Sequence, residues 1–274
     1  MGVRNGTALA AAAILSLTGC SSLGTRAAVT TRLDQAIAGT QRTEAERARD
    51  VYRHPRDTLL FFGLRANLDV VEVLPIGGWY TKVIAPTVRN HGRYIAAMPP
   101  VTAGNANSEN SRQAYMAILA ATPDMLDRVQ VVDFDPGKKP TVADGSADLV
   151  LTFRNIHNWM AAERAEAAFR DMYRMLKPGG ILGVVEHRGN EAVPQDPRAR
   201  SGYVNQTYAI KLIESVGFRL VASSEVNANP RDTKDYSGGV WTLPPVLREG
   251  EKDRAKYVAI GESDRFTLKF VKPR

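Results

Sequence analysis

The chain has 274 residues, of which 44% are hydrophobic and 24% are charged, and its net charge is +7. This composition excludes a disordered chain and is typical of a globular protein with one sizeable domain or two small ones. Lysine and arginine are scattered, without a basic block of the kind that binds nucleic acid, so we expect no nucleic-acid partner. Attraction to an anionic lipid surface explains the positive charge equally well.

The first 19 residues have the pattern of an export signal. Arg4 precedes an Ala-rich apolar segment over residues 7–17, which is too short to span a bilayer. The following LTGC, residues 17–20, resembles a bacterial lipobox, in which the cysteine becomes the lipidated first residue. Cys20 is the only cysteine of the chain, so no thiol is left to pair in an oxidising compartment. We expect lipidation at Cys20; an ordinary secretory signal with a chance cysteine is the alternative.

Ser21 and Ser22 follow the lipobox, with no aspartate beside them. This pattern resembles lipoproteins sent to the outer membrane, which implies a periplasmic protein anchored there rather than at the inner membrane. Residues 20–41 are polar and Ala-rich without a strong period, which predicts a tether, with a short helix as an alternative for part of it, before a domain over residues 42–274. Thr43 is the expected N-cap of a helix over residues 43–51, and a second short helix is expected over 56–64.

Strands and helices alternate through the rest of the chain. The expected helices cover residues 79–89, 110–121, 161–176 and 205–216, and the expected strands cover 70–74, 93–98, 129–134, 147–153, 181–186, 218–226 and 265–271. Continuous apolar strands indicate burial on both faces, so we predict an α/β domain with a mostly parallel, doubly wound sheet. Ligands bind such sheets beyond the carboxyl ends of the strands. Residues 227–264 form a long polar insert, which is usually functional or disordered.

The most informative segment is VVEVLPIGGWYT, residues 70–81, where a buried strand ends in an acidic residue and a glycine-containing turn before a helix. Together with DGSADLVL at 144–151 and LKPGG at 176–180, it resembles class I S-adenosylmethionine-dependent methyltransferases. The most similar subgroup has EVxPxGGWYT, FRNxHNW and VVEHR motifs, found here at 72–81, 153–159 and 184–188. The resemblance implies a seven-stranded Rossmann-like sheet with an antiparallel last strand, S-adenosylmethionine as cofactor, and a small-molecule or envelope acceptor.

The resemblance also implies which residues bind the cofactor. Glu72 lies where the family has its strand-one acid, near the cofactor's amino group or the N–H groups of the turn, and small residues there allow close backbone approach. The implied cofactor-binding residues are Glu72, Leu74, Pro75, Gly77, Gly78, Tyr80, Asp135, which would contact adenine, and Asn155. Two departures stand out: Leu74 and Ile76 replace the first two glycines of the family pattern, and Met98 replaces the acid that binds the ribose. At Ile76 the pattern implies a positive φ, which is costly for a β-branched residue.

Candidate catalytic groups follow strands four and five. His157 could position or deprotonate the acceptor, and His187 with its neighbour Glu186 should lie at the same edge of the sheet. Each histidine could instead bond only to its own loop. The three residues could also form a metal site, but they lack a tight local spacing, so no metal is predicted. Trp79, Trp159 and Trp241 are candidates for an aromatic wall at this face or for cover at the edge of the core.

Two functions agree with these patterns. One is a lipid-anchored methyltransferase, which the FRNxHNW, LKPGG and VVEHR motifs favour. The other is a catalytically inactive ligand-binding lipoprotein of the periplasm with a methyltransferase fold. Location favours the second, because the cofactor is made in the cytoplasm, and Leu74, Ile76 and Met98 point the same way.

Overall fold

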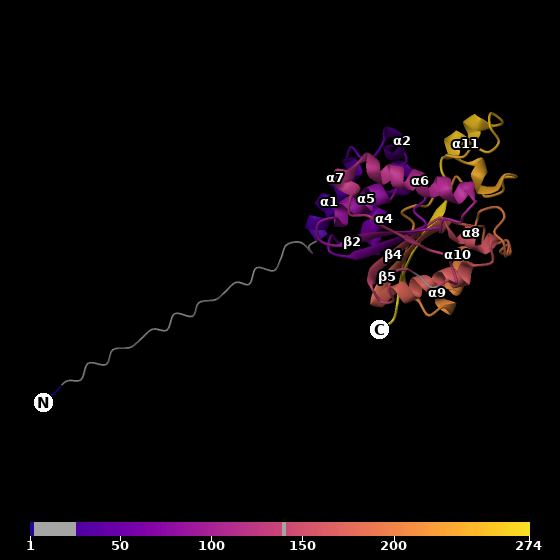
Figure 1. Cartoon of the computed structure of the whole chain (residues 1–274). Helices are drawn as coiled ribbons and strands as arrows, with labels where there is room; N and C mark the ends of the chain where they lie inside the picture. The colour runs from indigo at the N-terminus through magenta and orange to yellow at the C-terminus, as the bar shows by residue number, and fades with distance from the viewer. Residues whose placement is uncertain (3–25, 139–140) are drawn as a thin grey trace.

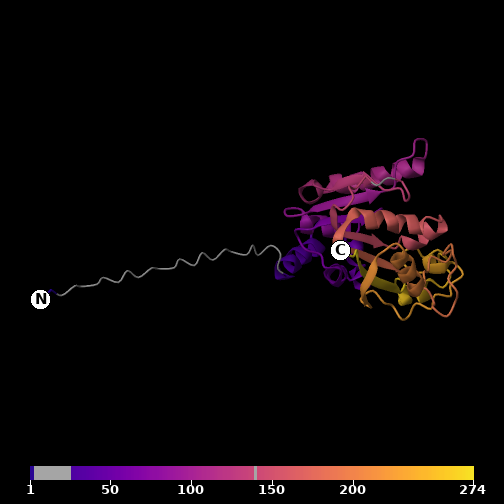
Figure 2. The ribbon, with the colours of Figure 1, turned by 90° about the horizontal axis from the view of Figure 1, so that it is seen from below.

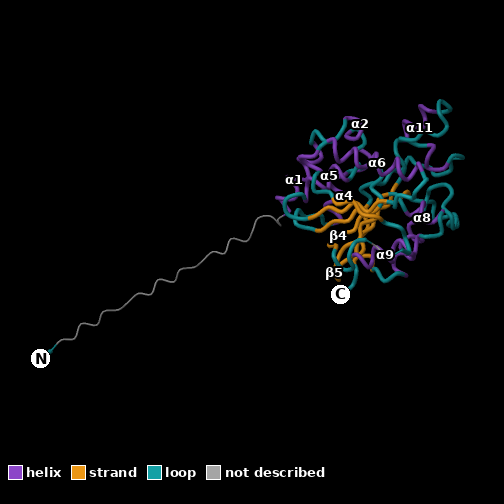
Figure 3. The backbone as a smooth tube through the Cα atoms, viewed as in Figure 1, coloured by secondary structure: helices purple, strands orange, loops and turns teal. Residues whose placement is uncertain are grey.

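The computed structural model describes residues 1–2, 26–138 and 141–274. A seven-stranded sheet forms the centre, and helices enclose it (Figure 3). The strands are β1 (Asp69–Val73), β2 (Arg93–Met98), β3 (Gln130–Asp133), β4 (Ala147–Phe153), β5 (Leu176–His187), β6 (Arg219–Ser224) and β7 (Arg265–Val271). Their order is β3-β2-β1-β4-β5-β7-β6, and only β7 runs antiparallel to its neighbours. The predicted fold class, including the antiparallel last strand, is confirmed.

Helices cover both faces of the sheet (Figure 1). They are α1 (Arg26–Ala38), α2 (Glu44–Arg47), α3 (Asp50–Arg53), α4 (Pro55–Phe62), α5 (Thr81–Val88), α6 (Ala106–Ala121), α7 (Pro123–Leu126), α8 (Ile156–Ala161), α9 (Ala165–Met175), α10 (Gln206–Ser215) and α11 (Arg254–Ile260), with a 3₁₀ turn, η2 (Gly239–Thr242). None of the helices described is long and apolar enough to cross a membrane.

Two apolar cores result from the alternation of side chains along the strands. In β1, Val70 points into the core that includes α1, α4 and α5, whereas Val71 and Val73 point into the core that includes α8, α9 and α10. The segments that follow β5, orange to yellow in Figure 2, lie on one side of the molecule, and β2 and β3 with their helices lie on the other. Because helices cover both faces of the sheet, a ligand-binding site can form at the ends of the strands.

The amino-terminal part of the domain differs from the prediction. The tether expected over residues 20–41 is wrong for residues 26–41, because α1 packs on α4 and α5 and buries Val29, Leu33 and Ala36. The Gln41 side chain also donates hydrogen bonds to the carbonyl oxygens of Ala36 and Lys82. Thr43 is an N-cap, as expected, and it forms a capping box with Glu46. The export signal, Cys20 and the adjoining serines lie outside the described residues.

The helix predicted over residues 161–176 is α9, which begins at Ala165, and a separate short helix, α8, precedes it. Glu163, with φ 58°, interrupts the helical backbone between α8 and α9. The FRNIHNW motif therefore ends within α8. The apolar face of α9 is confirmed, since Ala168, Phe169 and Met172 are fully buried. Residues 176–180 begin β5 instead of forming a turn before it.

Candidate active site

The turn after β1 places the backbone strain at a different residue from the one expected. Leu74 takes the left-handed conformation, with φ 55°, and its N–H donates to the Ala97 carbonyl oxygen at 2.8 Å. This conformation costs a non-glycine residue roughly 1–2 kcal/mol. Ile76, for which we expected a positive φ, avoids it and is 43% exposed. Gly78 has φ 64°, so the final glycine of the pattern does meet a backbone requirement.

A cavity of about 320 Å³ lies beside this turn, at the carboxyl ends of β1 and β4; we name it the turn cavity. Six of the eight predicted cofactor-binding residues line it: Glu72, Leu74, Pro75, Gly77, Tyr80 and Asn155. A Cβ added at Gly77 would meet no atom within 4 Å, so the backbone there is open to a ligand. The cavity continues past Trp79 toward α2 and α3. The sequence therefore predicted one side of this cavity and missed the other.

Gly78 and Asp135 lie outside the lining of the turn cavity. Asp135 forms an ion pair with Arg164 at 2.5 Å, which gives its carboxylate a structural partner. Met98, at the end of β2, is 1% exposed and belongs to the core. The end of β2 therefore offers no acid to a ribose.

Glu72 is a buried carboxyl group at the floor of the turn cavity. The Tyr94 hydroxyl donates to its Oε2 at 2.5 Å, and Tyr94 is in turn hydrogen-bonded to Thr81. Burial raises the pKa of Glu72 to about 7, against the opposing effects of the Tyr94 hydrogen bond and of Arg154 and Arg53. A cation bound in the cavity would favour the ionised form.

Asn155 and Tyr80 hold the walls of the turn cavity in place. The Asn155 amide donates to the Val73 carbonyl oxygen and to the Thr152 hydroxyl, both at 3.1 Å, and so ties the ends of β1 and β4 together. The Tyr80 ring stacks on Phe153, with 3.7 Å between ring centroids. These contacts fix the rim through side chains that also face the cavity.

A second cavity of about 290 Å³ lies under the insert between β6 and β7; we name it the insert cavity. Its lining comprises Arg49, Arg53, Arg154, His157, His187, Val240, Trp241, Leu243, Pro244, Pro245, Val246, Ser263 and Arg265. Arg49, Arg53 and Arg154 also line the turn cavity, so the two cavities adjoin. Two of the predicted catalytic residues thus face the insert cavity.

Glu186 links the predicted catalytic residues to one another. Its carboxylate is fully buried and accepts backbone N–H groups on both oxygens, from Ile156 at 2.6 Å and from His187 at 2.8 Å. His157 Nδ1 lies 3.0 Å from Glu186 Oε1. Because this carboxylate acts as an acceptor, His157 carries its proton on Nδ1 and leaves Nε2 free to accept one. Glu186 is therefore a positioning residue, and His157 is the candidate base.

His187 is held in a neutral form beside His157. Its Nδ1 lies 2.6 Å from the Ser263 hydroxyl, and the centroids of the His157 and His187 rings are 5.4 Å apart. Burial, with His157, Arg265 and other nearby cations, holds the pKa of His187 well below its usual value. His187 can therefore exchange hydrogen bonds with a ligand at neutral pH without adding charge.

The same three residues have one ligand atom each within 4.8 Å of the others, which is close enough for a metal site. The surrounding charges oppose a cation: four arginines line the insert cavity, and both Glu186 oxygens already accept hydrogen bonds. The prediction that His157, His187 and Glu186 come together is confirmed. Their hydrogen bonds suit acid–base work better than metal binding.

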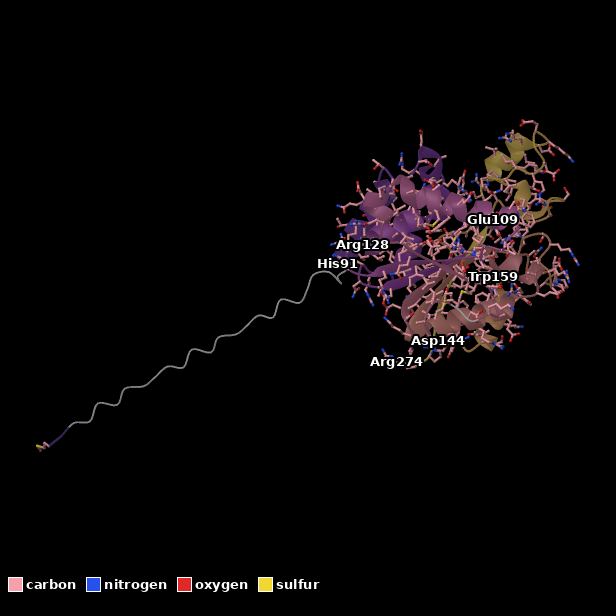
Figure 4. The ribbon with its side chains drawn as sticks, in the orientation of Figure 1. His91, Glu109, Arg128, Asp144, Trp159 and Arg274 are labelled. Atoms are coloured by element: carbon pink, nitrogen blue, oxygen red, sulfur yellow. The ribbon has the colours of Figure 1, made fainter. Side chains whose placement is uncertain are left out.

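The three tryptophans have three different positions. Trp159 is 4% exposed and packs against Phe134 and Phe169, so it belongs to the core and not to the site. Trp159 is part of α8 and is labelled in Figure 4. Trp79 lines the turn cavity and donates to the Glu46 carbonyl oxygen. Trp241, in the insert, meets the His157 ring edge to face at 5.9 Å.

Sequence patterns did not indicate that Arg49, Arg53 and Arg265 belong to the site. Arg49 and Arg53 come from the helical segment before β1, and Arg265 begins β7. The four-residue spacing of Arg49 and Arg53 would have placed both side chains on one helix face. Nothing local indicated that this face meets Arg154, since the contact joins segments about 100 residues apart.

A third cavity, of about 480 Å³, lies at the opposite end of the sheet. Gly92, Arg93 and Gln130 line it, at the amino ends of β2 and β3. In Figure 4 its lining residue Arg128 lies near His91, at the far end of the molecule from Trp159. Parallel α/β sheets bind ligands at their carboxyl ends, so we place the site at the two smaller cavities.

Comparisons with known proteins agree with the fold. Residues 90–184 match the family described as Methyltransferase domain, whereas no curated protein matches the chain. Among solved structures, a SAM-dependent methyltransferase from Aquifex aeolicus is similar, with 14% identity and a TM-score of 0.57 over 89% of this chain and 98% of the other. The [4+2]-cyclase SpnF has 15% identity and a TM-score of 0.61 over 89% and 93%.

An arsenic(III) S-adenosylmethionine methyltransferase from Chlamydomonas reinhardtii is also similar, with 15% identity and a TM-score of 0.50 over 76% of this chain and 64% of the other. At these identities the likeness concerns the fold, and a fold hosts many functions. The chain therefore carries a segment that matches the methyltransferase domain family, within a domain that has the methyltransferase fold.

Proposed function

We propose that this protein is an S-adenosylmethionine-dependent methyltransferase, with the cofactor in the turn cavity and the methyl acceptor in the insert cavity. The observation that carries the proposal is the junction of the two cavities, which share Arg49, Arg53 and Arg154. A donor and an acceptor bound in adjoining cavities meet the requirement that the reacting groups be held close together. The matches to methyltransferases support the same reaction.

The residues of the turn cavity fit this cofactor. Gly77 leaves room for a ligand against the backbone, and Glu72 offers a carboxylate to the ammonium group. When bound, the cofactor supplies an electrophilic methyl group on a sulfonium. His157 Nε2 would accept the proton that the acceptor loses as its new bond to the methyl group forms, and Glu186 would stabilise the charged imidazole.

Calorimetry of the purified chain with S-adenosylmethionine and S-adenosylhomocysteine tests cofactor binding. We expect binding in the micromolar range for the wild type, loss of binding in Gly77→Val and retained binding in His157→Ala. A Cβ at position 77 meets no protein atom within 4 Å, so the valine side chain projects into the open space of the cavity. Ala120→Val is the control, because Ala120 is exposed on α6 and does not line the cavity. If no heat of binding is measured at high micromolar concentrations of the cofactor, the proposed methyltransferase function is contradicted.

The affinity for S-adenosylhomocysteine should depend on pH through Glu72. Below its pKa of about 7 this group is protonated, and binding an ammonium group next to it requires release of the proton. We expect affinity to fall about tenfold from pH 8 to pH 6, because only the ionised fraction is competent. Glu72→Gln should bind weakly at pH 8 and show no such dependence. Equal wild-type affinities at pH 6, 7 and 8 would contradict this role.

A second candidate is a ligand-binding protein with this fold that transfers no methyl group. The specific observation is at the end of β2, where Met98 belongs to the core and offers no carboxylate to a ribose. A structural neighbour named as a cyclase belongs to the same fold. Transfer of a labelled methyl group from S-adenosylmethionine to an acceptor would favour the methyltransferase over this alternative, whereas binding of S-adenosylhomocysteine alone agrees with both.

We also propose that the protein is a lipoprotein, anchored through Cys20 at the periplasmic side of the outer membrane. The LTGC motif at residues 17–20 and the absence of any other cysteine support this location. Replacing Cys20 with serine should shift the protein from the membrane fraction to the soluble fraction of fractionated cells. Unchanged membrane retention, with no lipid detected on the wild type by mass spectrometry, would contradict the anchor.

A further inference from the structure

The boundary between the two cavities holds an excess of buried positive charge. Arg49, Arg53 and Arg265 all pair with one acid, Glu262: Arg49 Nε lies 2.5 Å from Oε1, Arg53 Nε lies 3.7 Å from Oε2, and Arg265 bonds to Oε2. Glu262 is 2% exposed and carries one negative charge. Three guanidinium groups thus share a single carboxylate, and Arg154 adds a fourth cation.

Two of these arginines lack partners of their own. Within the described ranges, the Arg154 guanidinium makes no hydrogen bond or ion pair, although it faces both cavities. Arg53 is 5% exposed, and its Nε is buried without a hydrogen-bond partner. Arg53 shares its one acid with Arg49 and Arg265, and the half-buried Arg154 has no acid beside it, so an anion between Arg53 and Arg154 would be stabilised.

The pKa values of the same two groups agree with this picture. Burial and the nearby Arg154 lower the pKa of Arg53 to about 8, and burial and Arg265 lower the pKa of Arg154 to about 10. Because a guanidinium keeps its charge at neutral pH, the lowered pKa reflects the cost of holding each cation in a poorly solvated place. An anion between them would remove that cost.

The other wall of the insert cavity is apolar. Trp241, Leu243, Pro244, Pro245 and Val246 all come from the insert and face the arginines and histidines. Such a cavity, apolar on one side with charged groups converging from the other, is typical of sites for small organic molecules. At about 290 Å³ it has room for a single ring with a charged substituent.

We propose that the methyl acceptor is a small organic anion, whose carboxylate or phosphate binds Arg53 and Arg154 while its apolar body packs against Trp241 and the neighbouring prolines. This inference rests on the proposed function, because it assigns a substrate class to the insert cavity. Carboxylates and phosphates share the planar or multidentate oxygen arrangement that a guanidinium binds well. His157, at 5.9 Å from Trp241 between ring centroids, adjoins the apolar body.

Calorimetry with three matched probes tests the proposal: benzoate, phenyl phosphate and the neutral benzamide. We expect the better of the two anions to bind the purified chain at least about tenfold more tightly than benzamide, the minimum for a hydrogen-bonded charge pair. The tighter anion then identifies the group as carboxylate or phosphate. Equal affinity of both anions and benzamide would overturn the proposal.

Variants separate the charge from the apolar wall. Arg154→Met should abolish most of the anion preference, while Arg170→Met, an exposed residue of α9 paired with Glu166, should keep it. Trp241→Ala should weaken all three probes alike and leave the preference for the anion unchanged. An anion preference that survives in Arg154→Met would overturn the assignment.

The cofactor's own carboxylate is the competing occupant, because Arg154 also faces the turn cavity. We expect saturating S-adenosylhomocysteine to leave the affinity for the anion unchanged or improved, whereas displacement of the anion would overturn the proposal. Anion preference without any S-adenosylhomocysteine binding would contradict the proposed function and leave the anion site standing. Cofactor binding without anion preference would support the proposed function and overturn the anion site.

Discussion

Replacing Glu186 with alanine should destabilise the protein by roughly 3–5 kcal/mol. The fully buried carboxylate accepts the backbone N–H groups of Ile156, His157 and His187, as well as the His157 ring. Alanine would leave these donors without an acceptor at the start of α8. Urea denaturation followed by circular dichroism measures the free energy of unfolding of both proteins.

Glu166→Ala is the matched control, because Glu166 is 61% exposed and pairs only with Arg170 on its own helix. We expect it to change the free energy of unfolding by less than about 0.5 kcal/mol. Glu186→Gln should fall between the two, since an amide can accept on only one side. A loss below about 1 kcal/mol for Glu186→Ala would show that solvent or a rearranged α8 satisfies the donors.

Replacing Glu262 with glutamine should cost about 3 kcal/mol or more at pH 7, because it removes the only acid shared by Arg49, Arg53 and Arg265. Burial alone would raise the pKa of Glu262, but Arg265, Arg49 and Arg53 together lower it to about 2. Urea denaturation at pH 7, with Glu251→Gln as an exposed control, measures this loss.

The sign of the pH dependence follows from the lowered pKa. The unfolded chain binds a proton on this group near pH 4.5, whereas the folded chain does so only near pH 2. The contribution of Glu262 is therefore complete above about pH 4.5 and is lost as pH falls toward 2; it amounts to roughly 3 kcal/mol. Below that window the wild type and Glu262→Gln should approach each other in stability. A constant difference from pH 7 to pH 2.5 would contradict this account.

Patterns within one element were enough to predict much of the fold. The strand expected over residues 265–271 has the bounds of β7, because alternating apolar residues follow a polar insert. The N-cap at Thr43 could be recognised since a capping box is a local motif. The antiparallel last strand was implied by the resemblance and not by any local pattern.

Other features depended on tertiary contacts that no local pattern shows. Helix α1 was taken for a tether because its buried positions, Val29, Leu33 and Ala36, are too few to give a strong period. The strain of the β1 turn lies at Leu74 rather than Ile76, since the Leu74 N–H bonds to β2.

The candidate site was predicted where sequence motifs at the ends of two neighbouring strands contained its residues. His157, His187 and Glu186 come together because β4 and β5 are neighbours in the sheet and end at the same edge. The arginine cluster was missed because it joins α3, the end of β4 and the start of β7. Only the folded chain brings these three segments to the boundary of the two cavities.

Hydrogen–deuterium exchange with and without S-adenosylhomocysteine tests most directly whether the ligand binds at the carboxyl end of the sheet. We expect slower exchange in peptides covering residues 72–81 and 153–158, which include residues that line the turn cavity. We expect no change in exchange over residues 85–93 and 125–130, which include residues that line the larger cavity at the opposite end. Protection confined to that opposite end, or no protection at saturating ligand, would contradict the account.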